Sequence, residues 1–159
     1  MIKSIVLLSF LTLISCNFSK DERKPERINW GTIEIYTKSQ KVLIYKEEDT
    51  ASFEETKYKR ISGKGFSSKY KLDTIVKKTF KLSVSERDSI SKYAYHLITK
   101  PFFTDKMATC YAGYVLIKLR ERNTTIMCEY ESVGEWSTVS NETKKIYDIL
   151  KTKINIAKQ

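Results

Sequence analysis

The residue types best suited to chemistry in this 159-residue chain are three cysteines and one histidine. His96 has no second histidine or cysteine at the spacing that a zinc site needs. No Gly-x-Ser-x-Gly turn accompanies it, which argues against a Ser–His–acid hydrolase. The acidic run 47–49 lacks the regular spacing of a calcium-binding loop. The sequence therefore predicts no catalytic residue set, no metal ligands and no cofactor.

The first sixteen residues have the layout of an export signal. Lys3 supplies a short positive start, Ile5 to Ile14 form an apolar run, and Ser15 precedes Cys16. This three-part layout is typical of a secretory signal peptide. A helix needs about 20 apolar residues to cross a bilayer, so the run is too short for a permanent span. We expect residues 1–15 to be removed on export.

The four residues Leu13-Ile14-Ser15-Cys16 resemble the lipobox of bacterial lipoproteins. The resemblance implies that Cys16 is diacylated, becomes the first residue after cleavage and is then N-acylated. A single acyl chain holds a protein to a bilayer only marginally, whereas several chains make a lasting anchor. The alternative is an ordinary signal peptide that happens to end near a cysteine.

Residues 16–27 are charged and have no apolar periodicity, which predicts a flexible tether. Asn17 differs from the aspartate of the inner-membrane retention signal, and this favours the outer membrane. The stretch Ser19-Lys20-Asp21-Glu22 resembles the lysine-plus-acid signal of surface lipoproteins in the Bacteroidetes, although a solvated linker would look similar. The expected location is the cell envelope, lipid-anchored at the outer membrane, with the surface as the implied face.

The chain carries a formal net charge of +10, spread along its length without a compact arginine cluster. The simplest explanation is a well-solvated surface. The functional alternative is attraction to an acidic protein, an acidic glycan or lipid head groups. Export and the lack of a recognition-helix or RNA-binding signature argue against nucleic acid.

The first half of residues 28–157, which we expect to form a single domain, has strand-like patterns. Alternation of apolar and polar residues predicts strands over 30–37 and 42–45. Residues 47–69 are polar and contain Gly63 and Gly65, which predicts a long loop around one further strand. Residues 70–82 regain apolar positions and are predicted to form a long edge strand.

Two helices and a hairpin are predicted in the rest of the domain. Ser83 and Glu86 form a capping box that starts a helix ending before Pro101. Residues 111–119 and 124–130 are rich in β-branched and aromatic residues and predict a hairpin. Ser140 is placed to cap a last helix. The predicted fold class is α+β, a mostly antiparallel sheet with two helices on one face.

Cys110 and Cys128 remain once Cys16 is lipidated, an even pair in an oxidising compartment. A turn at 120–123 would place Cys128 opposite Val115, and Cys110 would then lie roughly 17 Å away along the strand. A disulfide needs Cα atoms within about 7 Å. Two alternatives stay open: a bend at 112–113 that allows the disulfide, or two separate thiols.

Loop aromatics are the candidate contact residues. Tyr111 and Trp136 each lie near a glycine, and we expect loops to expose them as interface anchors. Lys106 and Arg122 would add charge steering. The alternative for Trp136 is that it packs under the last helix.

Three short motifs resemble the acceptor for O-glycosylation in exported Bacteroidetes proteins: Asp49-Thr50-Ala51, Asp73-Thr74-Ile75 and Asp88-Ser89-Ile90. The resemblance implies Thr50 and Thr74 as acceptors. Ser89 falls within the first predicted helix and is the least suited of the three.

Two function classes are compatible with these features. One is a membrane-anchored, non-catalytic binding, inhibitor or protective module of the cell envelope. The other is a small hydrolase acting on envelope glycans. The scarcity of catalytic residue types favours the first.

Overall fold

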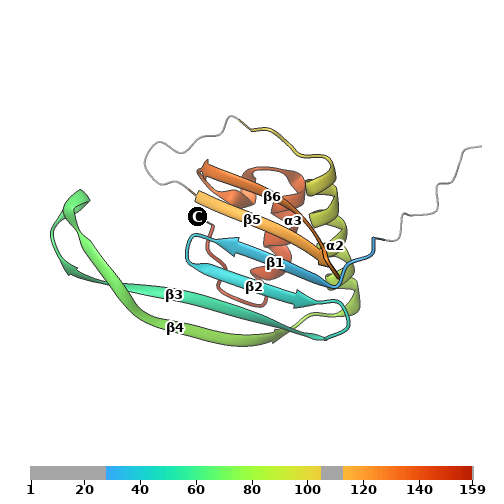
Figure 1. The fold of residues 1–159 in the computed structure, drawn as a ribbon, viewed down its shortest axis with the longest axis horizontal. Coiled ribbons are helices and arrows are strands. Elements are labelled where there is room, and N and C mark those ends of the chain that lie inside the picture. The colour runs from blue at the N-terminus through green and yellow to red at the C-terminus, as the bar shows by residue number, and fades with distance from the viewer. Residues whose placement is uncertain (1–27, 105–112, 159) are drawn as a thin grey trace, which may run out of the picture.

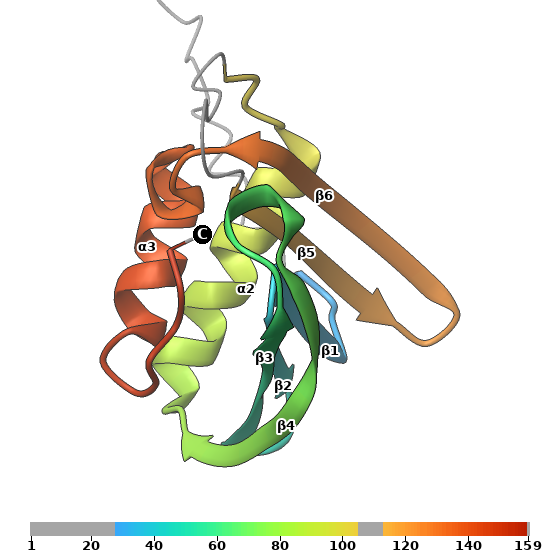
Figure 2. The same cartoon turned by 90° about the vertical axis from the view of Figure 1, so that its left-hand side faces the viewer.

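The computed structural model describes residues 28–104 and 113–158. Six strands form one antiparallel sheet in the order β4-β3-β2-β1-β5-β6 (Figure 1). Their bounds are β1 Thr32–Thr37, β2 Gln40–Tyr45, β3 Thr50–Ser62, β4 Lys69–Lys81, β5 Gly113–Glu121 and β6 Thr124–Val133. The helices α2 Val84–Thr99 and α3 Asn141–Leu150 both lie on one face of the sheet (Figure 2). The predicted α+β class is confirmed.

The hydrophobic core lies between that face and the two helices. Ile35 on β1 pairs with Val42 of β2 on one side and with Ile117 of β5 on the other, and all three side chains are fully buried. Successive strand residues point to opposite faces, so these branched side chains share the helix side of the sheet. Helices α2 and α3 contribute apolar side chains at helical spacing, namely Ile90, Ala94, Leu97, Ile146 and Leu150.

Both helices begin where the capping residues predict. The Ser83 hydroxyl accepts the Glu86 backbone N–H at 3.2 Å, and the Glu86 carboxylate accepts the Ser83 backbone N–H at 2.8 Å. This backbone hydrogen bond and an ion pair with Lys153 hold the pKa of Glu86 below its usual value. Ser140 and Thr143 form an equivalent box at the start of α3. Each box satisfies backbone donors that the first helical turn leaves without partners.

The sequence predicts a long loop around one further strand over residues 47–69. The strand is present as β3, but it covers most of the segment, so the predicted extent of the loop is wrong. The strand pairs with β4 from Thr50↔Lys81 to Ser62↔Lys69. Its second half is polar or exposed on both faces, so it lacks the alternation that marks a half-buried strand. The short connection between the strands contains the 3-10 helix η1 (Gly65–Ser67), and Gly63 before it adopts φ 83. A Cβ at Gly63 would lie 2.1 Å from the Ser67 carbonyl oxygen, so the turn requires glycine.

The β5–β6 hairpin is confirmed, but its turn is shorter than predicted. Glu121 pairs directly with Thr124, which leaves a two-residue turn with Arg122 in the left-handed region at φ 49. The register therefore differs by two residues from the expected one. Cys128 lies opposite Ile117 and not opposite Val115.

Candidate binding surface

Strands β3 and β4 extend well beyond the rest of the sheet. Strand β2 pairs with β3 only from Ile44↔Ala51 to Gln40↔Glu55, whereas β3 and β4 stay paired as far as Ser62 and Lys69. Residues 56–75 thus form a two-stranded ribbon, here called the arm, with no third strand beside it among the described residues. At about 3.3 Å per residue, its strands reach roughly 20 Å past the end of β2 (Figure 1).

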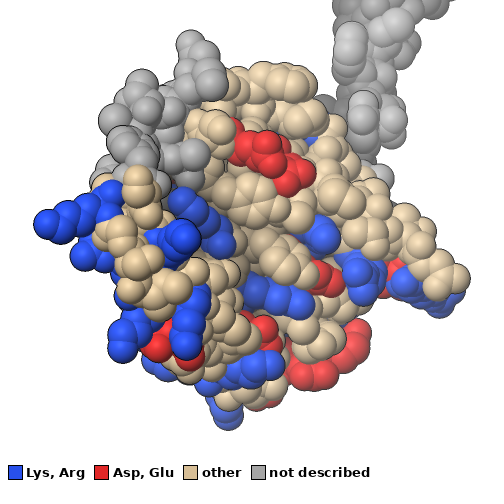
Figure 3. Space-filling view, turned by 60° about the vertical axis from the view of Figure 1, so that its left-hand side comes forward, with Lys and Arg blue, Asp and Glu red and all other residues tan. Residues whose placement is uncertain are grey.

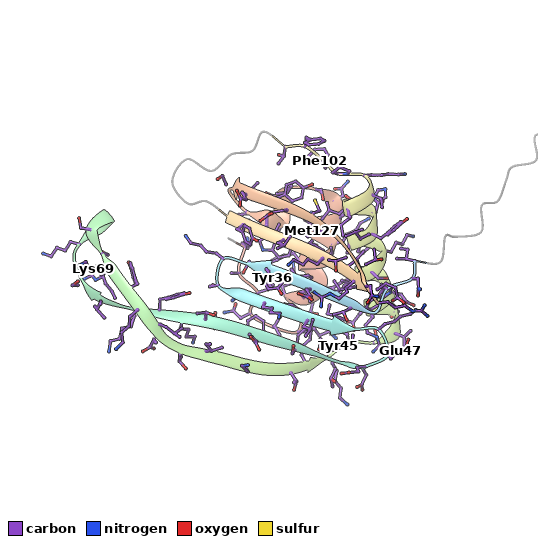
Figure 4. The ribbon with its side chains drawn as sticks, viewed as in Figure 1. Tyr36, Tyr45, Glu47, Lys69, Phe102 and Met127 are labelled. Carbon is purple, nitrogen blue, oxygen red and sulfur yellow. The ribbon has the colours of Figure 1, made fainter. Side chains whose placement is uncertain are left out.

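The arm is strongly basic. Asp73 is its one acidic residue, against six basic residues: Lys57, Lys59, Arg60, Lys64, Lys69 and Lys71. Basic side chains gather around the projecting arm at the left of Figure 3, and Lys69 lies near its tip in Figure 4. Lys57 lies 3.8 Å from the Glu55 carboxylate, an acid at the arm's base. With six cations against one acid, the arm carries an excess of positive charge that its own residues do not neutralise.

One face of the arm carries most of its large exposed apolar side chains. Alternate residues of a strand share a face, as do directly paired residues of neighbouring strands. The pairs Thr56↔Ile75, Tyr58↔Leu72 and Arg60↔Tyr70 therefore define one side, here called the apolar face. Its four large apolar side chains are between 48% and 60% exposed: Tyr58, Tyr70, Leu72 and Ile75.

The opposite side of the arm is here called the lysine face. It is defined by the pairs Lys57↔Thr74 and Lys59↔Lys71. Lys59 and Lys71 are like charges placed directly across from each other, an arrangement that destabilises a strand pair by itself. A negatively charged partner would relieve that repulsion. The arm thus combines exposed apolar side chains with unneutralised cations on an element that adds no described residue to the buried core.

Comparison with protein-family models, curated proteins and solved structures gave no match. The function is therefore inferred from the physical character of the described surfaces.

Trp136 is not an exposed anchor, so that prediction is wrong and its alternative holds. The side chain is fully buried in the short helix η2 (Trp136–Thr138) beside α3. Its indole N–H donates to the Ala157 carbonyl oxygen at 2.7 Å, and its ring meets Tyr147 edge-on with centroids 5.4 Å apart. Burial of a large ring with a satisfied N–H is the usual arrangement for a core tryptophan.

Arg122, another predicted contact residue, is not brought together with Trp136. Arg122 is exposed at the β5–β6 turn, at the opposite end of the hairpin from Gly113 and Val133. Strands of this length separate the two ends by roughly 25 Å. Tyr111 and Lys106 lie outside the described residues.

The cysteines for which lipidation or a disulfide was considered fall largely outside the described residues too. That is the case for Cys16, its leader and tether, and for Cys110. Cys128 lies on β6, and burial raises the pKa of its thiol. Both alternatives for Cys110 and Cys128, a disulfide or two separate thiols, stay predictions. No helix in the described ranges is both long and apolar enough to cross a bilayer.

The predicted O-glycosylation positions are reachable to different degrees. Thr74 is exposed on the arm and Thr50 is partly exposed at the start of β3. Ser89 is partly buried within α2. Modification at Thr50 and Thr74 stays a prediction.

A cluster on the helix-free face of the sheet satisfies its own charges. The hydroxyl of Tyr36, labelled in Figure 4, donates to the buried Glu34 carboxylate, which also lies 3.4 Å from Arg120 Nη2. Burial, and then the bond to Glu34, raise the pKa of Tyr36. Lys41 and Lys118 lie 5.3 and 5.1 Å from the centroid of the Tyr36 ring. These contacts join β1, β2 and β5. They give the Glu34 carboxylate and the Tyr36 side chain partners within the protein, so the cluster does not call for a ligand.

A cleft at the start of α3 is lined by carboxylates, the residue type that glycan hydrolysis needs. Each of its acids has a partner: Glu135 is ion-paired with Lys158, Asp148 is ion-paired with Lys151, and Glu142 is hydrogen-bonded to His96. Burial alone would raise the pKa of Glu142, but hydrogen bonds from its own backbone N–H and from His96 lower it. A glycosidase acid needs a raised pKa, so this cleft does not favour the glycan-hydrolase alternative. Within the described ranges, no three His, Cys, Asp or Glu side chains are grouped to hold a metal ion.

The burial of Trp136 leads to a stability prediction. Trp136→Ala should lower the free energy of unfolding by about 3–5 kcal/mol, because it leaves a large cavity between sheet and helix. The melting temperature should fall by roughly 10 °C or more. Arg122→Ala is the control, since its exposed side chain should contribute no more than about 0.5 kcal/mol. Equal melting temperatures for the two variants, measured by circular dichroism, would contradict the burial of Trp136.

Proposed function

We propose that the protein is a lipid-anchored, non-catalytic binding module of the cell envelope that uses the arm to contact an anionic partner. The observation that carries the proposal is the arm itself, with six basic residues, one acidic residue and an exposed apolar face. Exposed apolar side chains grouped on one surface mark interaction sites in soluble domains. A focused positive charge attracts and orients anionic partners.

The start of the described chain and the arm lie at opposite ends of the sheet. Residues 28–31 lead into β1 at the end of the sheet where Gly31 bonds to Arg120 and Lys46. The arm leaves from the other end, beyond Glu55, and Figure 1 shows the two at opposite sides of the molecule. A tether over 16–27 spans at most about 40 Å. Anchoring through Cys16 would keep the arm at a high effective concentration near an envelope surface.

Charge removal on the arm tests its role in binding. Lys59→Gln with Lys71→Gln should weaken binding to sulfated dextran, an anionic polymer, by roughly thirtyfold near 0.1 M salt, since each lysine contributes about 1 kcal/mol near an anionic surface. Binding of the unaltered chain should itself fade towards 1 M salt, where the screening length is about 3 Å. Fluorescence anisotropy of the labelled polymer gives both affinities.

The matched control removes two exposed lysines from the helices, by Lys92→Gln with Lys144→Gln. This variant has the same net charge as the arm variant and should keep nearly full affinity. Equal losses in the two variants would show that binding follows total charge, and the arm would then not be the contact element.

A further inference from the structure

We infer that the partner of the arm is an anionic phospholipid bilayer, with the apolar face inserted among the head groups and the lysines on lipid phosphates. The inference rests on the proposed function and names the class of its partner. It depends on the side-chain types of the two faces and on their exposure.

The apolar face has the composition of an interfacial membrane contact. Tyr58 and Tyr70 have an apolar ring and a polar hydroxyl, the combination that places tyrosine at the boundary between lipid and water. Leu72 and Ile75 are purely aliphatic and are about half exposed. Water contact at these two positions is unfavourable, and burial in the acyl boundary would remove it.

The lysines can reach lipid phosphates while the apolar face is inserted. A lysine side chain lies along apolar surface and keeps its ammonium group in the polar layer. Lys57, Lys59 and Lys71 belong to a ribbon only two strands wide, so no further described strand separates them from either edge. Several basic residues held near an anionic leaflet reinforce one another, because each adds its own attraction to the surface.

A second copy of this chain fits the arm poorly. Strand β4 is an edge strand and could in principle pair with another β4. Lys69, Lys71, Lys77, Lys78 and Lys81 all lie along it, and they would face like charges in such a pairing. Lysines on an edge strand are a recognised means of preventing this association.

An acidic glycan also fits less well than a bilayer. Its carboxylates would satisfy the lysines, but Leu72 and Ile75 offer neither an aromatic ring for stacking nor a hydrogen bond to a sugar hydroxyl. Half of the large side chains on the apolar face would then stay in water. A bilayer satisfies both faces of the arm.

The test uses the chain from residue 16 onward with Cys16→Ser, so that no acyl chain contributes. The described core residues all lie between Trp30 and Ile156, so this chain contains the whole described core. Tyr58→Trp places a fluorescent reporter on the apolar face. The two native tryptophans, Trp30 and Trp136, are buried and should give a constant background.

Vesicles of phosphatidylglycerol mixed with phosphatidylcholine should shift the emission of the Tyr58→Trp reporter to shorter wavelength. Vesicles of phosphatidylcholine alone should not, and high salt should reverse the shift. Leu72→Ser with Ile75→Ser in the reporter chain should weaken vesicle binding at least tenfold. The control, Val84→Ser with Met127→Ser, removes two exposed apolar side chains elsewhere and should leave binding unchanged. Circular dichroism verifies that each variant is folded.

Four results would overturn the inference. An equal shift with uncharged vesicles would show that anionic lipid is not recognised. Equal weakening by the Val84 and Met127 changes would show that the apolar face is not the contact. Binding to sulfated dextran without binding to anionic vesicles would remove the bilayer as partner and leave the proposed function standing. Binding to neither would overturn both proposals.

Discussion

Cys16→Ser should abolish incorporation of a palmitate analogue when the full chain is expressed in a bacterial host, and should move the protein out of the membrane fraction. The resemblance at residues 13–16 implies that the Cys16 thiol is the first acyl acceptor. Serine is nearly the same size but supplies no thiol for that step. The expected change is a complete loss of label, since a precursor that is not acylated offers no second acceptor.

Cys128→Ser is the matched control. It removes a thiol of the same type from β6, where burial raises the thiol pKa and so keeps it protonated and poorly reactive. This variant should keep its label and its membrane partition. Labelling that survives Cys16→Ser would contradict lipidation at that residue and remove the anchor from the proposed function. The arm's affinity for anionic surfaces, measured on the chain without acyl groups, would be unaffected.

Local signals were sufficient where neighbouring residues alone determine the structure. The Ser83–Glu86 box starts α2 because its hydrogen bonds join residues only three apart. Strand β1 could be predicted because Ile33 and Ile35 alternate with residues that face away from the helices. Each of these features depends on a few consecutive residues, so the sequence was enough.

Strand β3 could not be predicted in the same way, because half of it is stabilised from outside its own segment. Tyr58 and Arg60 are strand residues through their pairing with Leu72 and Tyr70, and not through burial. A polar stretch with Gly63 and Gly65 has the composition of a loop. The strand could have been found only by comparing two segments. Residues 56–62 and 69–75 both carry lysines and large apolar side chains, and a glycine-rich turn separates them, which is the pattern of a hairpin.

Trp136 illustrates a different limit. Its nearness to Gly134 suggested an exposed loop, but burial depends on what the fold places around a residue. The C-terminal segment supplies the Ala157 carbonyl oxygen for the indole N–H, and α3 supplies the Tyr147 ring. Both contacts come from outside the local sequence pattern. The alternative, packing under the last helix, is the arrangement that the structure has.

Replacing the arm is the most direct test of the central claim that the arm is the contact element. Residues 58–73 would be exchanged for Asn-Gly, a dipeptide suited to a two-residue turn, to join the paired residues Lys57 and Thr74. The described residues removed contribute no side chain to the buried core, so the sheet and helices should still form. The free energy of unfolding should change by no more than about 1 kcal/mol, since loop length has a weak effect on stability.

Binding of this shortened chain should be measured by co-sedimentation with phosphatidylglycerol-containing vesicles and by anisotropy with sulfated dextran. Both measurements use the chain without acyl groups. The account predicts a melting temperature close to that of the complete chain together with loss of nearly all binding to both probes. A shortened chain that melts normally and binds as tightly as before would contradict the claim and place the contact surface elsewhere on the domain.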